Sequence, residues 1–190
     1  MIALSILIPT VIGREDSYYK LVNKLNILTQ GHPVEILQCK DNKEITIGEK
    51  RNMLYNAASG IYSWQIDDDD DVSGNSILQI LFAINDGSDC VTFRERVNID
   101  GSLSTSNHSI KYERWQDNFD GFDYVRCPYF KDVIKTEIAK SVEAPKIRWN
   151  EDEQWSYAIK PYLLTETHID EEIYLYQCFS TEFNERYGIR

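Results

Sequence analysis

The sequence lacks the features that mark secreted, zinc-binding and membrane-spanning proteins. Its four cysteines are widely spaced and include no Cys-x-x-Cys pair, which argues against a disulfide framework and a zinc site. No apolar run approaches the ~20 residues that span a bilayer. No positive charge typical of a secretory signal precedes Arg14. We therefore expect a cytoplasmic protein with no transmembrane segment.

Basic residues are scarce as well. The chain has 20 Lys and Arg against 31 Asp and Glu, a net charge of −11 over 190 residues. An acidic surface disfavours broad contact with phosphate backbones, so extended nucleic-acid binding is not expected. Apolar residues make up 42% of the chain, which is enough for a packed interior and fits a disordered protein poorly. We expect one domain, residues 1–190.

Apolar runs alternate with amphipathic stretches in the first half of the chain. Expected strands are at 3–9, 34–39 and 61–66, and expected helices are at 17–28, after the capping residue Thr46, and at 73–84. Pro9 is expected to end the first strand. This order predicts an α/β fold with a Rossmann-type, mostly parallel central sheet and helices on both faces.

The pattern becomes more irregular after residue 88. Expected strands are at 89–99, 109–114 and 173–176, expected helices are at 130–141 and 152–159, and Asp100-Gly101 is an expected hairpin turn. We therefore divide the domain into residues 1–98 and a more irregular half, residues 99–190. His32 and His108 are expected in surface turns.

Five consecutive aspartates, Asp67–Asp71, are the most informative segment. Ligands of parallel sheets bind beyond the carboxyl ends of the strands, which places this run at one edge with Pro9-Thr10 and Lys40–Asn42. Adjacent carboxylates repel one another, and a solvated acidic loop is one interpretation. Because the run follows an apolar strand and precedes a helix, a site for Mg²⁺ or Mn²⁺ is the favoured one.

Several segments, in this order, resemble the family 2 glycosyltransferases of the GT-A fold. They are Leu4–Thr10, Glu35–Asn42, Gly48–Asn52 with Ala57 and Gly60, Ile66–Asp70, Trp149–Asp152, and Ile169-Asp170 with Ile173–Tyr176. The family transfers a sugar from a nucleotide donor with inversion at the anomeric carbon. The resemblance implies a GT-A-like fold, with residues 1–98 binding the nucleotide sugar and residues 99–190 facing the acceptor.

The resemblance also implies roles for single residues. Asp67-Asp68-Asp69 matches the DXD motif, with Asp69 and Asp67 as ligands of Mn²⁺ or Mg²⁺ and with Asp67 and Asp68 at the nucleotide sugar. The other residues expected at the nucleotide sugar are Pro9, Thr10, Asp41, Gly48 and Arg51. His168 precedes the last strand, where a further metal ligand is possible, although a lone histidine is more often structural.

Asp152, with Glu151 beside it, matches the motif that supplies the catalytic base. The acidic residues there also suit the first turn of a helix without any catalytic role. For Arg51, a helix-face salt bridge is the alternative to a contact with the donor phosphates. Among the tryptophans, Trp149 and Trp155 flank the predicted base and are candidates to stack on a sugar, although core packing is more common.

Two other functions compete with sugar transfer. A nucleotidyltransferase would carry a glycine-rich basic loop after the first strand, whereas Pro9–Arg14 contains one glycine. A non-catalytic nucleotide- or glycan-binding module would keep the fold without the chemistry. A UDP-sugar is the expected donor, although Lys40 stands where the family usually has an acidic residue. The sequence identifies neither the sugar nor the acceptor.

Overall fold

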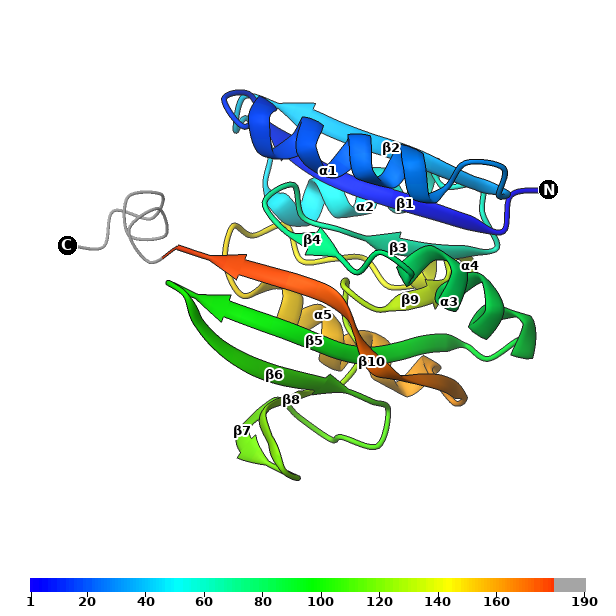
Figure 1. Cartoon of the computed structure of the whole chain (residues 1–190), viewed down its shortest axis with the longest axis vertical. Coiled ribbons are helices and arrows are strands. Elements are labelled where there is room, and N and C mark those ends of the chain that lie inside the picture. The colour runs from blue at the N-terminus through cyan, green and yellow to red at the C-terminus, as the bar shows by residue number, and fades with distance from the viewer. Residues whose placement is uncertain (180–190) are drawn as a thin grey trace.

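A central mixed sheet with helices on both faces forms the molecule (Figure 1). The computed structural model describes residues 1–179, so residues 180–190 of the expected second half lie outside it. The strands are β1 (Leu4–Val11), β2 (Val34–Asp41), β3 (Tyr62–Gln65), β4 (Asp71–Val72), β5 (Cys90–Ile99), β6 (Ser102–His108), β7 (Gln116–Phe119), β8 (Phe122–Arg126), β9 (Val133–Lys135) and β10 (Glu166–Cys178). The helices are α1 (Glu15–Leu28), α2 (Ile47–Ala57), α3 (Ser76–Ala83), α4 (Thr136–Ser141) and α5 (Glu151–Ile159), with short 3₁₀ turns η1 (Ile84–Asp86) and η2 (Lys160–Tyr162).

The first half contains the expected crossover units. Strand β1 pairs in parallel with β2 on one side and with β3 on the other. Thr46 caps α2 as expected, through a reciprocal capping box with Glu49. The prediction that Pro9 ends the first strand is wrong, because β1 continues to Val11. Beyond Leu7 the ladder partner of β1 is β2 alone, and proline is tolerated where one side of a strand has no ladder.

The second half departs further from the expected elements. The expected helix at 130–141 is wrong in its first part, where β9 inserts between β3 and β5, antiparallel to both. The expected strand at 109–114 is also wrong: β6 precedes it, and the chain turns after Ser109. The turn at Asp100-Gly101 is confirmed, with φ angles of 51° and 87° between the antiparallel strands β5 and β6. The late strand is longer than expected, since β10 lies parallel to β5 over most of its length.

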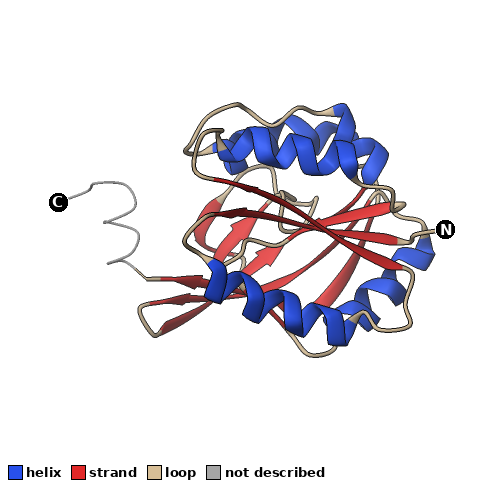
Figure 2. Ribbon diagram, turned by 90° about the horizontal axis from the view of Figure 1, so that it is seen from above, coloured by secondary structure: helices blue, strands red, loops and turns tan. Residues whose placement is uncertain are grey.

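Two hydrophobic clusters cover the two faces of the sheet. Side chains alternate along β1, so Ile6 and Ile8 join one cluster and Leu7 joins the other. Helices α1 and α3 contribute to the first cluster, and α2, α4 and α5 to the second. Figure 2 shows these helices on opposite sides of the strands. The central sheet is therefore buried on both faces, and its open positions are at the strand ends.

Trp155 belongs to the second cluster rather than to a binding surface. Its ring is fully buried and stacks on Phe130, with 4.2 Å between ring centroids. Of the two interpretations of Trp155, core packing is confirmed and stacking on a sugar is wrong, because no face of the ring reaches solvent. Trp149, in contrast, is 44% exposed.

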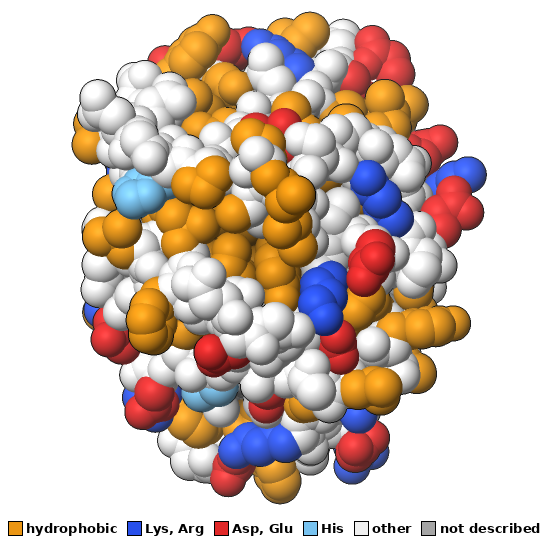
Figure 3. All heavy atoms as spheres, turned by 90° about the vertical axis from the view of Figure 1, so that its right-hand side faces the viewer, with side chains coloured by type: hydrophobic (Ala, Val, Ile, Leu, Met, Phe, Trp, Pro, Cys, Tyr) orange, Lys and Arg blue, Asp and Glu red, His pale blue; other side chains and the backbone are white. Residues whose placement is uncertain are grey.

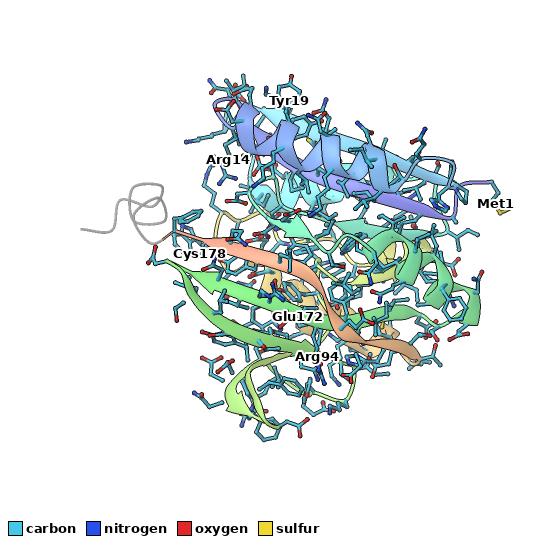
Figure 4. All side chains as sticks on the ribbon, in the orientation of Figure 1. Met1, Arg14, Tyr19, Arg94, Glu172 and Cys178 are labelled. Atoms are coloured by element: carbon cyan, nitrogen blue, oxygen red, sulfur yellow. The ribbon has the colours of Figure 1, made fainter. Side chains whose placement is uncertain are left out.

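The side of the molecule that carries the N-terminus exposes hydrophobic side chains between scattered charges (Figure 3). Large exposed hydrophobic residues in the described part of the chain include Ile27, Phe82 and Leu164. None of the helices described has both the length and the apolar character needed to cross a membrane. Arg14 and Cys178 lie at the opposite end, where β1 and β10 finish (Figure 4). The predicted site lies at that end.

Candidate active site

The aspartate run forms a tight turn directly after β3. The backbone N–H of Asp70 donates to the carbonyl oxygen of Asp67 at 3.1 Å. The side chains of Asp68 and Asp70 are each 1% exposed, whereas those of Asp67 and Asp69 are 28% and 31% exposed. The turn therefore presents Asp67 and Asp69 to solvent and directs the other two carboxylates into the protein.

Asp68 and Asp69 share one cation, the guanidinium of Arg14. Arg14 forms an ion pair with Asp68 and a second one with Asp69, whose Oδ2 lies 2.5 Å from Nη2. The Thr10 hydroxyl donates to Oδ2 of Asp68 at 2.6 Å. Burial raises the pKa of Asp68 to about 6, although Arg14 and Thr10 lower it. The loop between β1 and α1 thus neutralises part of the run.

Asp70 anchors the run to β10. The Tyr174 hydroxyl donates to Oδ2 of Asp70 at 2.6 Å, and the backbone N–H of Gln177 donates to Oδ1 at 2.8 Å. Tyr174 also accepts a hydrogen bond from the backbone N–H of Asp67 at 3.1 Å. The ammonium of Lys131 lies 3.3 Å from Oδ2 of Asp70. These contacts hold the turn in position, so Asp70 acts through the placement of its neighbours.

Arg51 joins the aspartate run to the start of α5. Its Nη2 lies 3.2 Å from Oδ1 of Asp67, and its Nε lies 3.2 Å from Oε1 of Glu151. Its Nη1 donates to Oε1 of Gln65 at 2.9 Å, and the guanidinium lies over the Phe130 ring. Burial raises the pKa of Asp67, but the Arg51 guanidinium and Lys131 outweigh it and hold that pKa below its usual range. Arg51 is thus a buried bridge between two predicted motifs.

Asp152 lies next to this bridge, in the first turn of α5. It is half-buried, and its Oδ1 accepts a hydrogen bond from the backbone N–H of Glu153 at 2.8 Å. Glu151 is buried instead, and burial raises its pKa while Arg51 lowers it. Of the two predicted catalytic carboxylates, Asp152 is therefore the more accessible one, and Glu151 is paired with Arg51.

Lys50 ties the ends of β1 and β2 together. Its ammonium pairs with Asp41 and donates to the carbonyl oxygen of Thr10 at 2.6 Å.

Gly48, on the same helix, lies against the backbone of Pro145, and a Cβ at Gly48 would be 1.8 Å from the Pro145 carbonyl oxygen. The structure therefore explains this glycine by a close backbone contact. Lys50 and Arg51 are both buried, and neither lines the cavity described next.

A cavity of about 840 Å³ opens over the aspartate run. It lies between the β1–α1 loop and the end of β10, and its lining includes Arg14, Lys43, Asp68, Asp69 and Gln177. A second cavity, of about 610 Å³, lies elsewhere on the sheet and includes Arg94 and Glu172. Figure 4 shows Arg14 at the end of the molecule and this second pair farther along β5 and β10. The cavity at the aspartates is the one that meets the predicted motifs.

Solved structures of S. aureus TarS, a family 2 glycosyltransferase, resemble the fold of this chain. TarS 1-349 matches with a TM-score of 0.67 at 15% identity, covering 97% of this chain and 63% of that chain. The chain has a GT-A fold. The complex of TarS 1-349 with UDP matches with a TM-score of 0.66 at 13% identity, covering 97% and 63% of the two chains. The complex with UDP-GlcNAc matches with a TM-score of 0.63 at 14% identity, covering 92% and 58%.

This GT-A chain spans less than two thirds of the length of TarS 1-349. No family model matches the sequence, and no curated protein matches it. The similarity therefore lies in the course of the chain. It confirms the α/β fold with a GT-A-like sheet that the strand order and the resemblance predicted.

The GT-A fold does not bring His168 to the aspartates. His168 lies near the start of β10 beside Thr92, with 3.0 Å between its Nδ1 and the threonine hydroxyl. The aspartate run contacts Tyr174 and Gln177, near the other end of the same strand. Among the described residues, no three His, Cys, Asp or Glu side chains converge as a metal cage. Mg²⁺ commonly takes one or two carboxylates and completes its shell with water and substrate phosphate, so Asp67 and Asp69 fit such an ion.

A buried charge cluster lies behind the run in the GT-A sheet, and the sequence did not reveal it. Lys131 connects Asp70 to Glu95, with 2.9 Å between its ammonium and Oε1 of Glu95. His108 lies between Glu95, at 3.4 Å, and Asp132, at 3.1 Å. The expectation that His108 is in a surface turn is wrong, since it is fully buried on β6.

His108 should make stability depend on pH. Burial alone would lower its pKa, but Asp132 and Glu95 raise it to about 9. A histidine in the unfolded chain has a pKa of about 6.5, so the stabilisation is complete below that pH and is lost as the pH rises through 9. We expect this effect to remove up to about 3 kcal/mol of the unfolding free energy. Urea unfolding of the wild type and His108→Gln from about pH 6 to about pH 10 measures it. A gap between the two proteins that stays constant with pH would contradict the prediction.

Proposed function

We propose that this chain is a metal-dependent, inverting glycosyltransferase that moves a sugar from a nucleotide-diphosphate donor to a hydroxyl acceptor. The observation that carries the proposal is the Arg51 bridge. In it, Arg51 pairs with Asp67 of the predicted DXD motif and with Glu151 of the predicted base motif. The two motifs are far apart in sequence and belong to different halves of the chain. The GT-A fold and the TarS complexes with UDP and UDP-GlcNAc support a UDP-sugar as the donor.

In this proposal the donor lies in the cavity over the aspartate run. Asp69 and Asp67, the two accessible carboxylates of the turn, would hold Mn²⁺ or Mg²⁺ beside the donor diphosphate. Such an ion would neutralise the negative charge that builds up on the leaving diphosphate. Asp68 and Asp70, which are buried, fix the turn through Thr10 and Tyr174. Pro9, Thr10 and Asp41 are the residues predicted at the nucleoside, and they lie at the ends of β1 and β2, outside the lining of the cavity.

Asp152 acts as the base on the acceptor hydroxyl. Removal of the hydroxyl proton makes the acceptor oxygen nucleophilic, and its attack opposite the leaving diphosphate inverts the anomeric carbon. Glu151 contributes by holding Arg51, and Arg51 in turn holds Asp67. The base and the donor-binding turn therefore share one rigid connection, which keeps the acceptor and the donor at a constant separation.

Donor binding tests the proposal directly. Calorimetry should show that UDP and UDP-GlcNAc bind with Mn²⁺ present, and that chelation of the metal weakens binding by about tenfold or more, because the diphosphate loses its counter-ion. Asp69→Asn should lose the metal-dependent part of the affinity. Asp71→Asn is the matched control, since Asp71 belongs to the same run but pairs with Lys24 at 2.8 Å.

Slow release of UDP from UDP-GlcNAc in water measures the chemical step in parallel with binding. If neither UDP nor UDP-GlcNAc binds with or without Mn²⁺, the proposal fails. If both bind and no UDP is released, the non-catalytic binding module becomes the better description.

A further inference from the structure

Arg14 lines the proposed donor site. It is the residue before α1, and its guanidinium pairs with Asp68 and Asp69, which line the same cavity. The side chain is 23% exposed, and it contacts the buried carboxylate of Asp68. Figure 4 shows it at the end of the molecule where β10 finishes. No motif in the sequence pointed to this residue.

The Arg14 guanidinium and a metal ion would compete for the carboxylate of Asp69 and would repel each other. Asp69 is the predicted metal ligand, and its Oδ2 is 2.5 Å from Nη2 of Arg14. A divalent cation bound between Asp67 and Asp69 would lie next to the positive charge of Arg14 and would share its carboxylate. Coulomb repulsion at such distances is substantial where the groups are half-buried. Binding of the metal alone therefore has to overcome Arg14.

A diphosphate in the cavity would change the competition between Arg14 and the metal ion for Asp69. Its oxygens match the planar fork of an arginine, which binds phosphate with two parallel hydrogen bonds. A donor in the cavity would therefore give Arg14 a new partner beside the run and would bring negative charge to the metal. The cost of separating Arg14 from Asp69 is then offset by the new contact.

We propose that Arg14 competes with the divalent cation for Asp69, and that the donor diphosphate relieves this competition by binding the Arg14 guanidinium. This inference rests on the proposed function for the identity of the diphosphate. Its consequence is cooperative binding: the nucleotide strengthens metal binding, and by linkage the metal strengthens nucleotide binding by the same factor. Arg14 thus disfavours loading of the site with metal alone.

Titration of Mn²⁺ alone, and of Mn²⁺ with saturating UDP, measures this coupling. The wild type should bind Mn²⁺ weakly alone and much more tightly with UDP. Arg14→Gln should bind Mn²⁺ alone about tenfold more tightly than the wild type, and the enhancement by UDP should fall by about tenfold or more, within the usual range of coupling between sites. Lys24→Gln is the matched control, because it removes one positive charge from the far end of the same run and should leave both affinities unchanged.

The two titrations separate failure of this inference from failure of the proposed function. The competition is overturned if Arg14→Gln binds Mn²⁺ alone no more tightly than the wild type, or if neither protein binds it. The role of the diphosphate is overturned if UDP enhances Mn²⁺ binding equally in both proteins. UDP that binds neither protein, with or without metal, overturns the proposed function, while the titration of Mn²⁺ alone still decides the competition. Arg14→Lys, which keeps the charge, should resemble the wild type with Mn²⁺ alone and guards against an effect of folding.

Discussion

Asp152→Asn should reduce sugar transfer by about 10²–10⁴-fold, the usual contribution of a positioned general base. Asparagine keeps the size and polarity of the side chain but cannot accept the acceptor's proton. The affinity for UDP should stay near that of the wild type, because Asp152 lies at α5 and not in the turn proposed to hold the diphosphate. Turnover with an acceptor and calorimetry with UDP measure the two effects.

Glu153→Gln provides a control from the next position on the same helix. The Glu153 carboxylate accepts a hydrogen bond from the Tyr157 hydroxyl at 2.7 Å, so its own partner lies on α5. This variant removes the same charge from the first turn and should transfer sugar at a nearly normal rate. Similar losses in the two variants would favour the alternative interpretation, in which acidic residues only stabilise the start of the helix.

Arg51→Met should cost about 3–5 kcal/mol of unfolding free energy, as expected when one partner of a buried ion pair is removed. The methionine would occupy part of the space over Phe130 but would leave Asp67 and Glu151 without their shared cation. Because Arg51 holds Asp67, metal-dependent binding of UDP should weaken as well. Urea unfolding measures the stability, and calorimetry measures the binding.

Removal of a second charge separates the contribution of the ion pairs of Arg51 to stability from the contribution of its packing. In the double variant Arg51→Met/Glu151→Gln, one of the two carboxylates left without a partner is neutral, so part of the lost stability should return. Arg51→Lys keeps the charge but cannot reach Asp67, Glu151 and Gln65 together, and should lie between the wild type and Arg51→Met. A loss below about 1 kcal/mol in Arg51→Met would show that the bridge is not a major contributor to stability.

The sequence was most informative where local periodicity decides the structure. The apolar runs of β1 to β3 and the amphipathic pattern of α1 and α2 predicted the parallel half and the edge at which Asp67–Asp71 lies. The segment at 130–141 is predicted as one helix but begins with β9, because a short apolar run does not distinguish a buried strand from a helix. Its central residues Val133 and Ile134 pair with both β3 and β5, and that pairing depends on strands distant in sequence.

In the candidate site, too, local motifs predicted some residues, and others depend on contacts between distant parts of the chain. Asp67, Asp69 and Asp152 were predicted from their motifs, whereas the exposure of the two aspartates depends on the turn that the run forms after β3. Arg14, Lys131 and His108 were not predicted as site or cluster residues, because single charged residues carry no local pattern. Their roles arise from contacts with carboxylates on other strands and turns.

The sequence by itself determined the α/β class, the edge that carries the acidic motifs and the order of those motifs along the chain. These features follow from side-chain periodicity and from the right-handed connection of parallel strands, which operate over short stretches of chain. The tertiary structure alone decided which charges meet: Arg14 at Asp68 and Asp69, Arg51 between Asp67 and Glu151, and Lys131 beneath Asp70. Buried charges must find partners to offset their lost hydration, and only the folded chain brings those partners within reach.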